Sequence, residues 1–145
     1  MKASNQFTKE QKEQILAAIH KAEKATSAEI CVHIENHCKG MVLDRAVEVF
    51  RMLKMHETNA RNGVLIYIAL KDRLTSIIGD KAINEKVDPH FWNDCYQAMA
   101  DYFKKEEFAE GICTAIHLLE IELKPLFPHQ SDDSNELSDE ISFGV

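Results

Sequence analysis

The apolar residues near the start of the chain recur at helical spacing. Residues 8–11 match a capping box, in which the Thr8 side chain bonds the third helical amide and Gln11 reaches back to the Thr8 backbone. The apolar positions that follow at helical spacing are Ile15, Leu16, Ile19 and Ala22. This pattern predicts an amphipathic helix that runs to about Lys24.

Three later stretches have the patterns of β-strands. Residues 29–35, EICVHIE, alternate in the manner of a strand with one fully buried face. Residues 64–70, VLIYIAL, are almost wholly apolar, which is typical of a central strand covered on both faces. The short turn at residues 71–73 leads into residues 74–79, LTSIIG, which we expect to be the antiparallel neighbour of that central strand.

Helical spacing returns in four further segments. Apolar stripes predict helices from Met41 to about Met55, from about Ala82 to Val87, from Pro89 to about Lys104 and from about Glu106 to Glu122. Pro89 suits the first turn of its helix, whereas Pro125 and Pro128 are expected to end the last helix.

The order of these elements favours one fold class. A helical crossover joins the first two strands, which makes them parallel, and a short turn makes the next pair antiparallel. The sequence therefore predicts an α/β fold, a three-layer αβα sandwich in which helices flank a small mixed sheet. Residues 1–128 are expected to form a single domain.

Charge and composition narrow the classes of function. The chain has 145 residues and a formal net charge of −7, which argues against a nucleic-acid-binding surface because phosphate contacts need clustered lysine and arginine. The longest apolar run, residues 64–70, is too short to span a membrane, and the first residues lack a secretory signal. We therefore expect a cytoplasmic, monomeric protein.

The four cysteines are scattered and include no CxxC pair. A chain of this length builds its own core without disulfides, so the pattern favours reduced thiols. Cys31 and Cys113 lie among apolar neighbours and are predicted to be small core residues.

Residues 129–145 differ in composition from the rest of the chain. They contain no lysine or arginine, and their acidic residues are Asp132, Asp133, Glu136, Asp139 and Glu140. This composition predicts a flexible acidic tail. The alternative is that the spaced Leu137, Ile141 and Phe143 dock on a partner or on the protein's own surface.

Two polar loops flank the predicted hairpin. Glu57, Thr58, Asn59 and Asn62 precede the central strand, and Asp80, Asn84, Glu85 and Asp88 follow its partner. In an antiparallel pair the start of one strand lies beside the end of the next, so both loops should emerge at one sheet edge. Ca²⁺ accepts such oxygen ligands from separate loops, and Glu29, which begins the first strand, faces either this site or solvent. The alternative is two solvated loops rich in turn-forming residues.

No motif of a known catalytic site is present. The chain has no glycine-rich phosphate loop, no HExxH motif and no GxSxG motif. His33 is predicted to be a packed or surface histidine rather than a ligand, and His90 follows Pro89 next to the second loop. The residues alone therefore favour a binding role over a defined reaction.

The segment RNGVLIYIALKDR, residues 61–73, followed by IIGDKAINEKV, residues 77–87, resembles the TPM domain family. The resemblance extends from about Phe7 to Phe127. The chain is similar to stand-alone bacterial members of the family. It implies an αβα sandwich around a sheet of about four strands, with loops stabilised by a bound divalent metal, often Ca²⁺. We expect Ca²⁺ here, with Mg²⁺ as the alternative. The positions Asn62-Gly63 and Gly79 match the family pattern, and loop chemistry favours Asp80 as the first metal ligand.

Three functions follow from these observations. The first is a divalent-cation-binding domain in which the metal orders the two loops and thereby modulates an unknown protein partner. The second, implied by the acid phosphatase activity associated with plant members of the family, is a metal-dependent phosphatase. The third is a metal-independent interaction module that uses the acidic tail.

Overall fold

The helices and strands as far as Leu126 follow one another in the predicted order. The structure is a computed structural model that describes residues 2–130 and 140–144. Its elements are η1 (Ala3–Gln6), α1 (Lys9–Ala25), β1 (Glu29–Glu35), α2 (Val42–Met52), η2 (Met55–Glu57), β2 (Gly63–Ala69), β3 (Leu74–Gly79), α3 (Lys81–Lys86), α4 (Pro89–Phe103), α5 (Phe108–Leu126) and β4 (Ser142–Phe143).

The strands form one mixed sheet in the order β3-β2-β1-β4. β1 and β2 are parallel, with Glu29 opposite Gly63 and Glu35 opposite Ala69. β2 and β3 are antiparallel, so that Val64 lies opposite Gly79. The parallel pair, the hairpin and the small mixed sheet are therefore confirmed.

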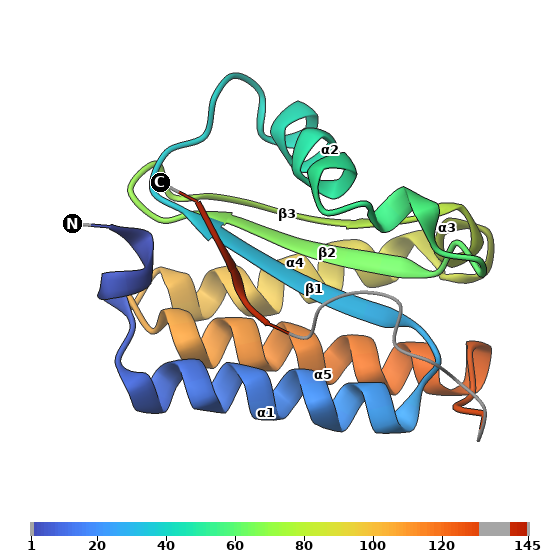
Figure 1. Cartoon of the computed structure of the whole chain (residues 1–145). Coiled ribbons are helices and arrows are strands. Elements are labelled where there is room, and N and C mark those ends of the chain that lie inside the picture. Colours follow the sequence, from blue (N-terminus) through green and yellow to red (C-terminus); the bar gives the residue numbers. More distant parts are fainter. Residues whose placement is uncertain (1, 131–139, 145) are drawn as a thin grey trace.

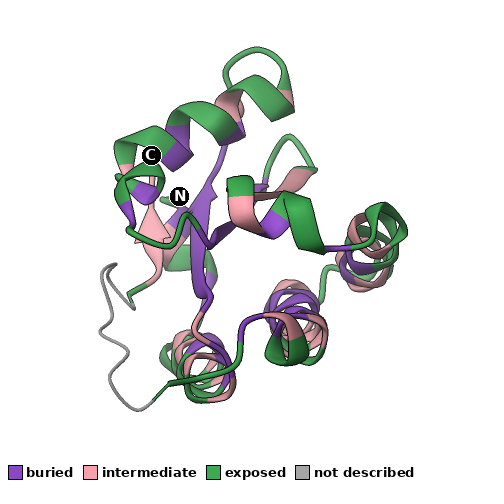
Figure 2. Ribbon diagram, turned by 90° about the vertical axis from the view of Figure 1, so that its right-hand side faces the viewer, coloured by how far each residue is buried: buried purple, intermediate pink, exposed green. Residues whose placement is uncertain are grey.

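Helices cover both faces of this sheet (Figure 1). α1, α4 and α5 lie along one face and α2 lies over the other, which gives the predicted αβα layers. The alternation within β2 explains why this strand reads as wholly apolar: Val64, Ile66 and Ile68 enter the larger core, and Leu65, Tyr67 and Ala69 enter the core beneath α2. The two central strands, β1 and β2, are accordingly buried along their whole length (Figure 2).

Local signals set most element boundaries. The Thr8 capping box is present, with Gln11 N–H donating to Thr8 Oγ1 over 3.1 Å and Thr8 N–H donating to Gln11 Oε1 over 2.8 Å. α2 ends at Met52 rather than near Met55, because Lys54 adopts a left-handed conformation with φ of 59° that a helix cannot continue through.

The last helix is longer than its prolines suggest. α5 runs to Leu126 with Pro125 inside its final turn, so the prediction that Pro125 ends the helix is wrong. A proline so close to the end removes one backbone donor, while Phe127 N–H still donates to Leu123 O over 2.7 Å. None of the helices in the described parts of the chain has the length and apolar character needed to cross a membrane.

The fourth strand comes from the segment that was expected to be a tail. Ser142 and Phe143 pair with His33 and Ile34 of β1, in parallel register. These residues belong to the sheet, and Ile141 and Phe143 pack against the larger core, as expected from the alternative in which this segment docks on the protein's own surface. Most of the acidic positions predicted to lie in the tail, Asp132, Asp133, Glu136 and Asp139, and also Leu137, fall outside the described residues.

The cysteines are thiols, and no disulfide joins them. Cys31 is buried as predicted, whereas Cys113 is half-buried at the margin of the core. Burial raises the pKa of Cys95 to about 12 and, together with Glu110, raises the pKa of Cys113 to about 11. These two thiols are therefore protonated and unreactive at neutral pH.

Candidate functional site

One edge of the sheet collects the two polar loops. The starts of β1 and β2 and the end of β3 meet there, because Glu29 lies opposite Gly63 and Gly79 lies opposite Val64. Glu29 N–H donates to Asn62 O over 3.2 Å, and Asp80 N–H donates to Gly63 O over 2.9 Å. The predicted meeting of the two loops at one edge is confirmed, and we call this region the loop edge.

Asp80 is the buried carboxylate of the loop edge, with 6% of its surface exposed. It caps α3 by accepting a hydrogen bond from Lys81 N–H over 2.7 Å. Its two oxygens also accept hydrogen bonds from Arg61, at 2.7 Å from Nε and 2.8 Å from Nη2. Burial alone would raise the pKa of Asp80, but Arg61, the Lys81 amide and His56 together lower it. Asp80 is therefore an ionised carboxylate neutralised by a guanidinium.

Other side chains with oxygen atoms belong to the same two loops and to the start of β1. Asn62 is buried and its Nδ2 donates to Ser27 O over 3.0 Å, while Asn84 Nδ2 donates to Gly79 O over 2.7 Å. Glu29 is also buried. The Thr58 hydroxyl is buried and has no hydrogen-bond partner in the part of the chain that the structure describes. A buried hydroxyl in this situation fits a role in holding a polar ligand.

The remaining predicted ligands lie on the surface. Glu57 and Glu85 are exposed side chains, and Asp88 caps α4 by accepting a hydrogen bond from His90 N–H over 2.9 Å. Within residues 2–130 and 140–144, no three His, Cys, Asp or Glu side chains gather in a way that could hold a metal ion. A cation at the loop edge would therefore combine Asp80 with amide, hydroxyl and backbone oxygens, a donor set that suits Ca²⁺.

The loop edge also contains an unusual backbone conformation. Arg61 has a φ of 51°, in the left-handed region that residues with a side chain rarely adopt. Its carbonyl accepts a hydrogen bond from Ala82 N–H over 3.0 Å, which ties the two loops together. This positive φ lies one residue before Asn62-Gly63, the dipeptide that matches the family pattern.

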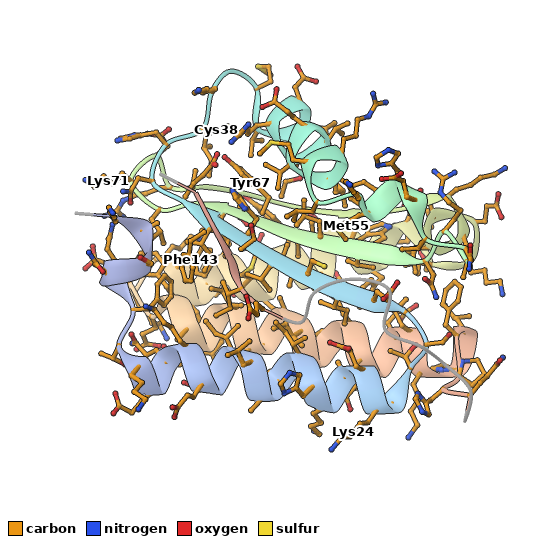
Figure 3. All side chains as sticks on the ribbon, in the orientation of Figure 1. Lys24, Cys38, Met55, Tyr67, Lys71 and Phe143 are labelled. Carbon is orange, nitrogen blue, oxygen red and sulfur yellow. The ribbon has the colours of Figure 1, made fainter. Side chains whose placement is uncertain are left out.

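A second polar group lies at the opposite end of the same strands, beneath α2. It consists of His33, Glu35, Arg45 and Tyr67, and we call it the Glu35 cluster. Arg45 donates from Nε to Glu35 Oε2 and from Nη2 to Glu35 Oε1, both over 2.9 Å. Tyr67 donates its hydroxyl to Glu35, and His33 Nε2 lies 2.9 Å from Glu35 Oε1. Tyr67 and Cys38 lie on the α2 side of the sheet (Figure 3).

Charges in the Glu35 cluster are strongly stabilised. Burial would raise the pKa of Glu35, but hydrogen bonds from Arg45, Tyr67 and His33 lower it to about 2. Burial lowers the pKa of His33, against the opposing effect of Glu35. At neutral pH the cluster is therefore an ion pair between Glu35 and Arg45, supported by a neutral histidine and a neutral tyrosine.

The sequence contained a weak signal of this cluster. Cys31, His33 and Glu35 share one face of β1, and Tyr67 interrupts the aliphatic run of β2. Polar residues on a buried strand must find partners, so they point to a hidden network. The prediction that His33 is a packed residue is consistent with its 4% exposure. Arg45 was missed because nothing in a helical stripe indicates that its side chain turns inward.

Stability should fall in acid partly because of Glu35. Its pKa is about 2 in the folded protein and near 4.5 when unfolded, so its contribution is complete above about pH 4.5 and is lost as the pH falls towards 2. Urea unfolding of the wild type and of Glu35→Gln between pH 5 and pH 2.5 measures this difference. The wild type is expected to lose more stability than the variant over this range.

The matched control is Glu48→Gln, which changes a carboxylate that also contacts Arg45 but is 61% exposed. Its stability should follow the wild-type dependence on pH. Equal pH dependence of the wild type and Glu35→Gln would contradict the assignment of a low pKa to Glu35.

Comparisons with known proteins agree with this architecture. The chain is similar to the BA42 protein of the psychrophilic bacterium Bizionia argentinensis, whose NMR structure superposes with a TM-score of 0.88 at 42% sequence identity, covering 94% of each chain. N-terminal domains from a P. gingivalis protein and from the Corynebacterium glutamicum protein cg2496 share the fold alone. They have TM-scores of 0.71 and 0.68 at 14% and 13% identity, and they cover 90% and 91% of this chain and 82% of their own.

Among curated proteins, none matches this chain. The sequence model of the TPM domain family, by contrast, matches residues 1–120, which include the loop edge and the Glu35 cluster. The chain therefore belongs to the TPM domain family.

Proposed function

We propose that this protein binds a divalent cation, Ca²⁺ in the first instance, at the loop edge. The observation that carries the proposal is Asp80, a buried and ionised carboxylate at the end of β3, next to the first residue of β2. In this proposal the buried Thr58 hydroxyl, which has no hydrogen-bond partner among the described residues, and the amide oxygens of Asn62 and Asn84 would supply neutral oxygen ligands of the type that Ca²⁺ accepts. Bound metal would contribute a fixed positive charge that orders both loops and so alters the surface offered to a protein partner.

Arg61 defines how such a site would work. Its guanidinium occupies both oxygens of Asp80, so a metal ion and Arg61 compete for the same carboxylate. The side chain of Arg61 is 47% exposed, which leaves it free to move into solvent when a metal arrives. The left-handed backbone at Arg61 costs on the order of 1 kcal/mol, and local strain of this type is concentrated at binding sites and switches.

Removing the competing cation should strengthen metal binding. We expect Arg61→Gln to bind Ca²⁺ about tenfold more tightly than the wild type, because the charge that opposes the metal is gone. Asp80→Asn should abolish binding. Isothermal titration with Ca²⁺ and with Mg²⁺, together with amide chemical shifts, measures both effects.

Arg51→Gln is the matched control, since it removes the same charge from an exposed position on α2. Its affinity for Ca²⁺ should equal that of the wild type. No response of the loop amides at millimolar Ca²⁺, in the wild type and in Arg61→Gln alike, would refute the proposal. An unchanged affinity in Arg61→Gln would refute the competition.

A metal-dependent acid phosphatase is the second candidate. The observation in its favour is the ion pair between Arg61 and Asp80. If a metal ion displaced Arg61 from Asp80, the guanidinium would lie next to the metal and could hold a phosphoryl oxygen. Hydrolysis of p-nitrophenyl phosphate should then require metal, and it should be lost in Asp80→Asn. Turnover that persists in the presence of a chelator would rule this candidate out.

A further inference from the structure

The outer edge of β1 holds the segment Ser142–Gly144 as an added strand. The backbone pairing is short: Ser142 lies opposite His33, Phe143 lies opposite Ile34, and Gly144 N–H donates to Ile34 O over 2.9 Å. Strands of globular proteins commonly have five or six residues, so two paired residues make a weak attachment. The specificity of the attachment must therefore come from side chains.

The first position of the segment, Ser142, is recognised through its hydroxyl group. Ser142 Oγ lies 2.7 Å from His33 Nδ1, and His33 Nε2 lies 2.9 Å from Glu35 Oε1. An ionised carboxylate only accepts hydrogen bonds, so Nε2 carries the proton and Nδ1 of the neutral ring is an acceptor. This position therefore requires a donor, and a hydroxyl is the side chain that supplies it here.

The second position is read through an aromatic ring. Phe143 points to the α1 side of the sheet, where its ring centroid lies 6.3 Å from that of Phe7 (Figure 3). Lys12 Nζ lies 5.5 Å from the centroid of the Phe143 ring, within the range of a cation–π contact. The buried Phe7 and a cation together favour an aromatic residue over an aliphatic one.

The third position accepts only glycine. A Cβ atom on Gly144 would lie 2.7 Å from Glu35 Oε1 and 3.1 Å from His33 Nε2. Glu35 cannot give way, because Arg45 and Tyr67 hold its carboxylate in place. The Glu35 cluster therefore also forms the wall of the Gly144 position, which has no space for a side chain.

We propose that this edge of β1 is a recognition slot for an extended peptide with the pattern hydroxyl residue, aromatic residue, glycine. Ser142–Gly144 fills the slot within the chain and so competes with a partner protein that carries the same pattern. The partner would add its strand in parallel to β1, in the mode of β-strand addition. A tethered segment competes at high effective concentration, so the partner binds well only when the chain's own segment is weakened or displaced.

The test uses the full chain with its own segment disabled. In Phe143→Ala/Gly144→Val the segment loses its ring and gains a clash, which should vacate the slot. A fluorescent, end-capped peptide of residues 140–144, Glu-Ile-Ser-Phe-Gly, is expected to bind this variant at least about tenfold more tightly than the wild type. Fluorescence polarisation measures the affinity, and the amide spectrum of the variant reports that it is folded.

Peptide variants distinguish specific recognition from non-specific binding. The peptides with Gly→Ala or with Phe→Ala should each bind at least about tenfold more weakly than the original. Equal affinity of the Gly→Ala peptide, or no binding of any peptide to the folded variant, would overturn the proposal. If the wild type dimerises and the Phe143→Ala/Gly144→Val variant does not, the slot binds a second copy of the chain. That result would overturn the proposal that a different protein binds there.

Hydrogen exchange in the wild type gives an independent measurement that needs no variant. The Gly144 amide should exchange much faster than the amides of β2, because the added strand opens without unfolding of the sheet. Exchange of Gly144 at the rate of global unfolding would show that the slot never opens in the native protein, and the proposal would fail.

Discussion

Replacement of Arg45 by alanine is expected to lower the free energy of unfolding by about 3 kcal/mol, a large share of the total for a domain of this size. The side chains of Arg45 and Glu35 are only 13% and 4% exposed, so the substitution leaves a buried carboxylate without its cation. Tyr67 and His33 still donate to Glu35, but they carry no charge. Urea unfolding at pH 7 measures the loss.

Two further variants establish the cause. Arg45 also contacts Glu48, whose side chain is 61% exposed, and Glu48→Ala should change stability by less than about 0.5 kcal/mol because surface ion pairs contribute little. Glu35→Gln/Arg45→Met removes both charges and should recover part of the stability lost in Arg45→Ala. A double variant less stable than Arg45→Ala would show that the uncompensated charge is not the cause.

Gly79→Ala is expected to lower the free energy of unfolding by about 2 kcal/mol through overpacking. A Cβ atom at this position would lie 2.7 Å from Ile83 Cγ2 and 3.0 Å from Trp92 Cη2. Ile83 is fully buried and Trp92 packs against the core, so neither side chain has room to retreat. The overpacking would also shift α3 away from β3 and disturb Asp80, so any affinity for Ca²⁺ at the proposed site should fall as well.

Gly40→Ala is the control for this substitution. Gly40 has a φ of 76°, and a methyl group added there would meet no atom within 4 Å, so alanine costs only backbone strain of about 1 kcal/mol. In Gly79→Ala/Ile83→Ala the smaller neighbour makes room, and the combined loss should be less than the sum of the two single losses. Additive losses would contradict a steric cause.

The loop edge illustrates how much of a binding site can be predicted from the sequence. The polar loops and the hairpin were visible as patterns, and an antiparallel pair allows only one arrangement of its ends, so their meeting could be predicted. The hydrogen-bond partner of Asp80 could not be predicted from the sequence. Arg61 reaches Asp80 from the other loop, where Arg61 itself has a left-handed backbone, and the sequence pattern does not indicate where a long, flexible side chain will lie.

The local patterns in the sequence are sufficient to predict the layers of this protein and its helices and strands as far as α5. Alternation in β1 and β2, helical spacing and turn residues are local properties, and burial of the apolar faces leaves few ways to combine them. Which polar groups come into contact depends instead on how the folded chain packs. The Glu35 cluster joins residues from two strands and a helix, and β4 returns from the far end of the chain to cover it. Such contacts depend on the geometry of packed side chains distant in sequence, and no local period encodes that geometry.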